Sequence, residues 1–124
     1  MPAPAPTILI ADDHPRMRRL LRGILEGGKY GIIEATNGLE AVEAHDEFHP
    51  AWIIMDVDMP EMDGLTATRT IQQRESNSRI VIITQHDSQA IRAEIDALGT
   101  YAFVPKDDLF DLPSLLKLHS DSNP

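Results

Sequence analysis

The sequence predicts an α/β protein with a doubly wound sheet of five parallel strands. Short apolar runs alternate five times with segments in which apolar residues recur at helical spacing. The first, third and fourth runs are almost continuously apolar, as expected for strands covered on both faces. Because crossovers between parallel strands are right-handed, the intervening helices should lie on both sides of the sheet.

The first half of the chain contains three of these repeats. Strands are expected at residues 7–11, 31–35 and 51–55, and the third runs directly into Asp56. Gly27-Gly28 ends the first helical pattern, and Asn37 can cap a helix over residues 38–48. A third helix is expected over residues 64–75.

The second half adds two more repeats. A fourth strand is expected at residues 79–83, ending at Thr84, and Ser88 can cap the helix that follows. A weaker fifth strand is expected at 102–104, and a last helix at about 109–118, with Pro113 in its first turn. The pattern predicts one domain over residues 7–119, preceded by an extended proline-rich arm at 1–6 and followed by a polar tail at 120–124.

Composition narrows the class of protein. The 124 residues include 11 Lys and Arg and 20 Asp and Glu, a formal charge of −9 that argues against direct binding of nucleic acid. There is no cysteine, which excludes disulfides. The amino end lacks the features of a signal peptide, and no apolar stretch approaches the ~20 residues of a membrane helix. We therefore expect a cytoplasmic protein that does not enter a membrane.

Charged and polar residues follow the predicted strands. Asp12-Asp13 follow the first strand, Asp56 the third, Thr84 the fourth and Lys106 the fifth. In a parallel sheet these ends share one edge, where ligands of such folds bind. Three carboxylates there repel one another unless a cation joins them, and Mg²⁺ prefers carboxylate and phosphate oxygens.

This residue set suits phosphoryl transfer. A carboxylate such as that of Asp56 can accept a phosphoryl group as an acyl phosphate. Mg²⁺ and Lys106 would neutralise the phosphoryl oxygens, and the Thr84 hydroxyl could donate to one of them. Each residue alone is more often a helix cap, a turn residue or a solvated charge, but their joint placement at four strand ends favours a functional site.

The sequence resembles the receiver domain of two-component response regulators over about residues 7–118. Four segments carry the resemblance: Asp12-Asp13-His14-Pro15, the Asp56-Val57-Asp58-Met59-Pro60-Glu61-Met62-Asp63-Gly64 segment, Ile83-Thr84, and Ala97-Leu98-Gly99 through Phe103-Val104-Pro105-Lys106. The resemblance implies a flavodoxin-like (βα)5 fold with strand order 2-1-3-4-5.

The resemblance also implies a role for each site residue. Asp56 would accept the phosphoryl group from the phosphohistidine of a histidine kinase or a histidine-phosphotransfer protein of a phosphorelay. Asp12, Asp13, Asp56 and the backbone carbonyl of Asp58 would bind Mg²⁺, and Lys106 would pair with the phosphoryl group. Such a domain catalyses at most its own phosphorylation and dephosphorylation.

In that family a switch pair reports phosphorylation, and the matching residues here are Thr84 and Phe103. Their movement would alter the face formed by the fourth helix, fifth strand and fifth helix, which would bind a downstream partner, an output domain or a second copy of the chain. The Asp-Asp-His-Pro start is most similar to the subgroup whose members often carry a helix-turn-helix output domain.

Three positions depart from the family pattern. Asp107 stands where proline usually follows the lysine, and Gln85 stands where a small residue usually follows the switch threonine. Asp58, two residues after Asp56, is acidic and could act on the hydrolytic water. We expect Gln85 and Asp58 to modulate phosphorylation.

Three other functions stay open at this point. The chain could be a receiver fragment of a DNA-binding transcriptional regulator, or a receiver-like interaction module that is never phosphorylated. It could also be a haloacid-dehalogenase-like phosphatase that uses Asp56 and Asp58. The five histidines, at positions 14, 45, 49, 86 and 119, are interpreted as having no metal-ligand spacing with one another.

Overall fold

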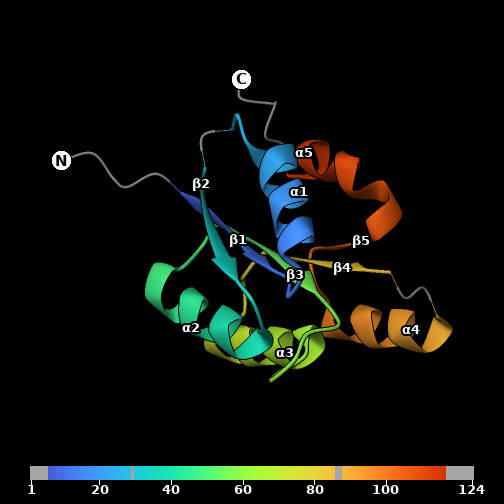
Figure 1. The fold of residues 1–124 in the computed structure, drawn as a ribbon. Coiled ribbons are helices and arrows are strands. Elements are labelled where there is room, and N and C mark those ends of the chain that lie inside the picture. The colour runs from blue at the N-terminus through green and yellow to red at the C-terminus, as the bar shows by residue number, and fades with distance from the viewer. Residues whose placement is uncertain (1–5, 29, 86–87, 117–124) are drawn as a thin grey trace.

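A computed structural model describes residues 6–28, 30–85 and 88–116, and it contains the predicted doubly wound sheet (Figure 1). Five parallel strands lie in the order β2-β1-β3-β4-β5. Their bounds are Thr7–Ala11 (β1), Gly31–Ala35 (β2), Trp52–Asp56 (β3), Ile80–Thr84 (β4) and Ala102–Pro105 (β5). The α-helices are Pro15–Leu25 (α1), Gly38–Phe48 (α2), Gly64–Arg74 (α3), Gln89–Leu98 (α4) and Leu112–Leu115 (α5).

Helices cover both faces of the sheet and divide the core into two layers (Figure 1). One layer packs α2, α3 and α4 against side chains such as Leu9, Ile53 and Ile82. The other packs α1 and α5 against side chains such as Ile10, Ile54 and Ile83. Every residue of β3 and β4 is buried, which explains why these strands are almost continuously apolar in sequence.

Helix starts agree with the expected caps. The Asn37 side chain accepts a hydrogen bond from Glu40 N at 2.8 Å, and the Ser88 hydroxyl accepts one from Ile91 N at 3.2 Å. These caps satisfy amide groups that have no partner within the helix, so they define where α2 and α4 begin.

The last helix differs from the prediction. A 3-10 helix (η1) runs from Lys106 to Asp111, directly after β5, and α5 starts only at Leu112 rather than at about residue 109. Pro113 does lie in the first turn of α5, where its missing N–H costs nothing. The predicted end of this helix, residues 1–5 of the arm and the tail at 120–124 lie outside the described residues.

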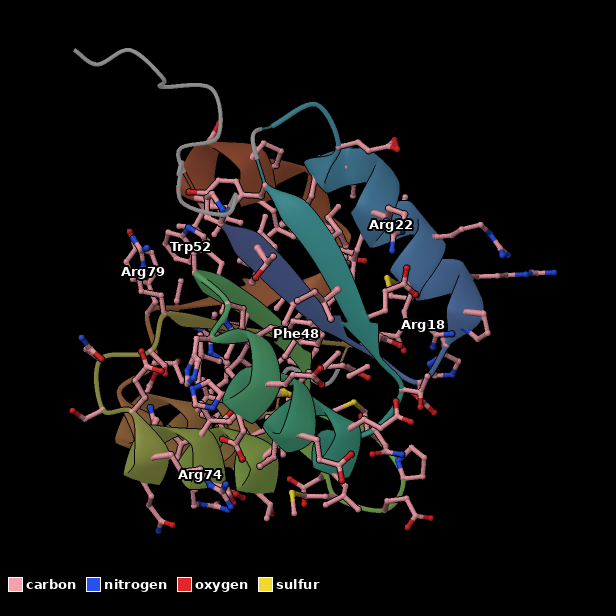
Figure 2. The ribbon with its side chains drawn as sticks, turned by 90° about the vertical axis from the view of Figure 1, so that its left-hand side faces the viewer. Arg18, Arg22, Phe48, Trp52, Arg74 and Arg79 are labelled. Carbon is pink, nitrogen blue, oxygen red and sulfur yellow. The ribbon has the colours of Figure 1, made fainter. Side chains whose placement is uncertain are left out.

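Strand β5 forms one edge of the sheet and β2 the other. Pro105 is the last residue of β5 and is paired with Thr84, so its missing N–H does not interrupt a central strand. At the opposite edge, Glu34 of β2 accepts hydrogen bonds from Arg18 and Arg22 of α1 at 2.9 and 2.8 Å (Figure 2). Within the described ranges, no helix is long and apolar enough to span a membrane.

Candidate functional site

The carboxyl ends of the strands gather the predicted site residues at one edge of the sheet. Asp12 follows β1, Asp56 ends β3, Thr84 ends β4 and Lys106 follows β5. Asp12, Asp56 and Thr84 are buried, although each has a polar side chain. Because buried polar groups need compensation, the contacts of these side chains decide what the site can do.

Lys106 supplies most of that compensation. Its Nζ lies 3.1 Å from Asp56 Oδ1 and donates a hydrogen bond to Asp12 Oδ2 at 3.2 Å. The Lys106 side chain is itself almost completely buried. A single ammonium group thus bridges two buried carboxylates.

The single positive charge of Lys106 does not balance the negative charges of Asp12 and Asp56. Burial, followed by the neighbouring Asp12 carboxylate, raises the pKa of Asp56 from 3.8 to about 6, and Lys106 only partly opposes this rise. Burial disfavours the charged form of Lys106, but the carboxylates of Asp56 and Asp12 outweigh it and raise the lysine pKa. The Asp56 carboxylate therefore remains electrostatically disfavoured, and an additional cation would stabilise it.

The acidic cluster has donors suited to a hard divalent cation. One ligand atom from each of Asp12, Asp13, His14 and Asp56 lies within 4.8 Å of the others. Asp13 Oδ1 is buried and lacks a hydrogen-bond partner in the described part of the chain, although His14 Nδ1 lies 3.1 Å away. Carboxylate oxygens with free coordinating capacity are the ligands that Mg²⁺ takes.

The turn after Asp56 explains the Met-Asp-Gly segment. Asp63 caps α3, because its Oδ1 accepts a hydrogen bond from Thr66 N at 2.9 Å. A Cβ on Gly64 would collide with the Asp56 backbone carbonyl and approach Met55 Cγ. Only glycine lets the first turn of α3 pack this closely behind the acceptor carboxylate.

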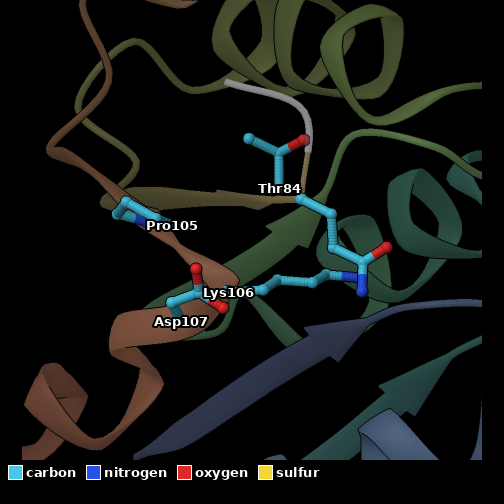
Figure 3. Close-up of a pocket in the computed structure, with 5 residues that line it drawn as sticks. Thr84, Pro105, Lys106 and Asp107 are labelled. Atoms are coloured by element: carbon cyan, nitrogen blue, oxygen red, sulfur yellow. The ribbon is translucent and has the colours of Figure 1, made fainter.

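Beside the acidic cluster lies a pocket of about 290 Å³, lined by Thr84, Gln85, Pro105, Lys106 and Asp107 (Figure 3). Gln85 is exposed and lines this pocket. Asp58 is also exposed, and its charge contributes to the raised pKa of Asp56. Thr84 and Lys106 thus share one cavity with Gln85, one of the two residues predicted to modulate phosphorylation.

Phe103 lies outside this pocket. It is partly buried on β5, where it pairs with Ile82 and packs against the core layer that α2, α3 and α4 cover. The guanidinium of Arg92 lies over its ring, 4.7 Å from the centroid. The ring therefore lies beneath Arg92 of α4. Phe103 precedes Pro105 by two positions in β5, and Pro105 pairs with Thr84 in the sheet.

His14 and Arg18, which were not among the predicted site residues, also contact Asp12 at this edge. His14 joins Asp12 twice, through a hydrogen bond from its backbone N at 2.9 Å and through its Nδ1 at 3.4 Å. Arg18 donates from Nη1 to the Asp12 backbone carbonyl at 2.8 Å. The four-residue spacing from His14 to Arg18, at the start of a helix that follows Asp12, was the available signal.

Known proteins match this chain over most of its length. The family model of the response regulator receiver domain matches residues 8–117. The chain is 37% identical over 100 residues to the chemotaxis protein CheY of Thermotoga maritima, covering 80% of this chain and 83% of that protein. It is 34% identical over 117 residues to CheY of Halobacterium salinarum, covering 94% and 96%.

Solved structures give the same result. A LuxR-family two-component response regulator from an Aurantimonas species superposes with a TM-score of 0.83 and 30% identity, covering 92% of this chain and 84% of that one. The sheet order, the buried Asp–Lys cluster and these relatives agree with one another. The chain belongs to the response-regulator receiver domain family of two-component signal transduction.

Proposed function

We propose that Asp56 is the phosphoryl acceptor of this receiver domain and that the phosphohistidine of a kinase or phosphotransfer protein is the donor. The bridging position of Lys106, 3.1 Å from Asp56 Oδ1, is the observation that supports this most directly. Asp12 contacts the same ammonium, but Asp56 is the last residue of the central strand β3, whereas Asp12 lies beyond the end of β1.

In the proposed reaction, an Asp56 carboxylate oxygen forms a bond to phosphorus while the phosphorus–nitrogen bond to the donor imidazole breaks. The acceptor must be ionised to attack, and Lys106 favours that form. Lys106 is placed to neutralise the phosphoryl oxygens as they approach, and Thr84 lines the same pocket. Mg²⁺ held by Asp12, Asp13, Asp56 and the Asp58 backbone carbonyl would supply the remaining positive charge.

Transmission of the signal is the second part of the proposal. Thr84 would turn toward the phosphoryl group, and Phe103 would leave its place beneath Arg92 and move inward. This movement would change the α4-β5-α5 face and so control a protein partner, a fused output domain or homodimerisation. If so, Thr84→Ala is still phosphorylated but the NMR signals of the Phe103 ring no longer shift on phosphorylation.

The other functions considered from sequence are less well supported. Membership of the receiver family disfavours a haloacid-dehalogenase-like phosphatase, so we propose a signalling domain that acts only on its own acyl phosphate. Relatives include both CheY proteins and a LuxR-family response regulator, so the partner could be separate or fused. A cytoplasmic location belongs to the same proposal.

Intact mass spectrometry after incubation with acetyl phosphate and Mg²⁺ tests the acceptor. We expect a gain of one phosphoryl group that is lost in Asp56→Asn and retained in Asp96→Asn, a matched change at an exposed carboxylate of α4. Absence of any gain would favour a receiver-like module that is never phosphorylated. Steady turnover of a phosphomonoester would favour the phosphatase.

A further inference from the structure

A second cluster of side chains that could hold a metal ion lies at the amino ends of the strands, opposite the carboxyl ends where Asp56 lies. It consists of His45 and His49 at the end of α2 and Glu75 at the end of α3. Both helices run antiparallel to the strands, so their last residues lie at the amino ends of β3 and β4. Phe48 and Arg74, the chain neighbours of His49 and Glu75, are labelled in Figure 2.

The interpretation that these histidines have no metal-ligand spacing was wrong. His45 and His49 are four residues apart, a spacing that places two side chains on the same side of a helix. Glu75, 30 residues away from His45, completes the group only because α2 packs beside α3. One ligand atom from each of the three residues lies within 4.8 Å of the others.

The distances suit a tetrahedral ion. His45 Nε2 lies 2.9 Å from Glu75 Oε1, and His49 Nδ1 lies 3.8 Å from the same oxygen. Ligands bound to Zn²⁺ at 2.0–2.1 Å lie about 3.3 Å apart at tetrahedral angles, which falls between these two separations. Small movements of the side chains would therefore be enough to form the site.

His45 has an unusual environment for a buried histidine. Its ring is almost fully buried, and each ring nitrogen faces a carboxylate: Nδ1 lies 3.1 Å from Asp46 Oδ1, and Nε2 faces Glu75. Carboxylates only accept hydrogen bonds, and a neutral imidazole has one N–H. One of these contacts therefore requires either a second proton or a metal ion in its place.

A metal ion at Nε2 would resolve this conflict. His45 Nδ1–H would donate to Asp46, which Arg74 holds through an ion pair. Nε2 would then present its lone pair to the metal. A carboxylate behind a ligating histidine fixes the tautomer and raises the basicity of the ligand.

His49 provides the open side of the site. It is the C-cap of α2, with a left-handed backbone (φ 45°), and its side chain is 70% exposed. The cluster is thus buried on the side of His45 and accessible on the side of His49. An ion can enter from solvent, and a water molecule can complete its coordination.

We propose that His45 Nε2, His49 Nδ1 and Glu75 Oε1 form a binding site for Zn²⁺ or a similar transition-metal ion, separate from the phosphorylation site. Binding would cross-link the ends of α2 and α3. Any proton on Nε2 would be released to the solvent when the ion binds. Two imidazoles favour a transition metal over Mg²⁺, so the two sites would select different ions.

Calorimetric titration with Zn²⁺ in excess Mg²⁺ tests the proposal, because Mg²⁺ competes at the acidic cluster. We expect one Zn²⁺ per chain, and at least about tenfold weaker binding in His49→Gln, since even loss of an outer partner costs that much. His14→Gln is the matched control, because it removes the imidazole of the acidic cluster. It should bind Zn²⁺ as the native protein does.

Thermal unfolding gives an independent readout. At about 100 times the dissociation constant, Zn²⁺ should raise the Tm by roughly 10 °C, and at the same Zn²⁺ concentration His49→Gln should reduce the rise to about half or less. Glu75→Gln is a second ligand variant, and circular dichroism checks that both variants are folded. Absence of Zn²⁺ binding, equal binding by both ligand variants and the native chain, or loss of binding in His14→Gln would each overturn the proposal.

Discussion

The ammonium group of Lys106 lies 3.1 Å from the carboxylate of Asp56, and both side chains are almost fully buried. The two residues are 50 positions apart in sequence, and strand β4 separates β3 from β5 in the sheet. The contact couples the charge of the proposed acceptor to that of a single lysine.

Replacing Lys106 should destabilise the metal-free protein. Lys106→Met leaves Asp12 and Asp56 buried without their shared cation, and we expect a loss of about 2 kcal/mol of unfolding free energy near neutral pH. Urea unfolding measures this loss. Lys106→Arg keeps the charge and should lose less, so equal losses in both variants would mean that the charge is not the cause.

Replacing Asp56 should have the opposite effect. Its pKa is raised in the folded protein from 3.8 to about 6, so folding favours the protonated form. The stability that this group contributes is present below its unfolded pKa and is lost as the pH rises through about 6. Asp56→Asn should therefore be more stable than the native chain at about pH 8, by about 1–2 kcal/mol.

The pH dependence shows whether the stability gain of Asp56→Asn comes from removing the Asp56 charge or from another effect of the substitution. Without divalent cations, the gain of Asp56→Asn should shrink toward zero as the pH falls below the ordinary pKa of 3.8. Mg²⁺ should also reduce the difference by stabilising the native chain. A gain that is independent of pH would contradict the assignment to the Asp56 charge. Asp96→Asn, at an exposed carboxylate on α4 that does not contribute to the Asp56 pKa, is the matched control.

The close contact behind Asp56 predicts that Gly64 cannot be enlarged. Gly64→Ala would push a Cβ into the Asp56 carbonyl and should cost about 1–3 kcal/mol of unfolding free energy. Gly23, inside α1, has nothing within 4 Å of an added Cβ. Gly23→Ala should therefore stabilise by about 0.5–1 kcal/mol, through helix propensity alone. Chemical denaturation of both variants checks the contrast in sign.

Gln85 should slow phosphorylation by small donors. It lines the pocket that contains Thr84 and Lys106, where a donor must enter. We expect Gln85→Ala to react with acetyl phosphate about threefold faster, which corresponds to less than ~1 kcal/mol in the barrier. Equal initial rates, followed by intact mass, would show that the glutamine does not obstruct the pocket.

Asp58 should influence the loss of the phosphoryl group. Its exposed carboxylate lies near enough to contribute to the raised Asp56 pKa, so its charge also acts on water or anions that approach Asp56. Asp58→Asn should change the autodephosphorylation rate by at least about twofold. The decay of phosphoprotein after removal of the donor measures this rate, and an unchanged decay would exclude a role. Asp63→Asn is unsuitable as a control, because Asp63 caps α3.

The sequence alone determined the order of the elements and most of their bounds. Residues that are buried at regular intervals are apolar, so the pattern of apolar residues can be followed in the sequence. This pattern and the helix caps predicted the bounds of α2 as found, and those of β3 and β4 to within one residue. The last helix was misplaced, because a 3-10 helix directly after Lys106 depends on how the chain leaves the sheet edge. The acidic residues and Lys106 could be placed at one edge because parallel strands end together.

Only the tertiary structure decided what those residues do to one another. Lys106 and Asp12 are 94 positions apart, and no local pattern states that one ammonium bridges Asp12 and Asp56. The raised pKa of Asp56 comes from its burial in the folded protein and from the Asp12 carboxylate, 44 positions away in sequence. The pairing of His45 with Glu75 likewise exists only because α2 and α3 pack together. Local periodicity encodes where strands and helices form, whereas distance and desolvation depend on the assembled fold.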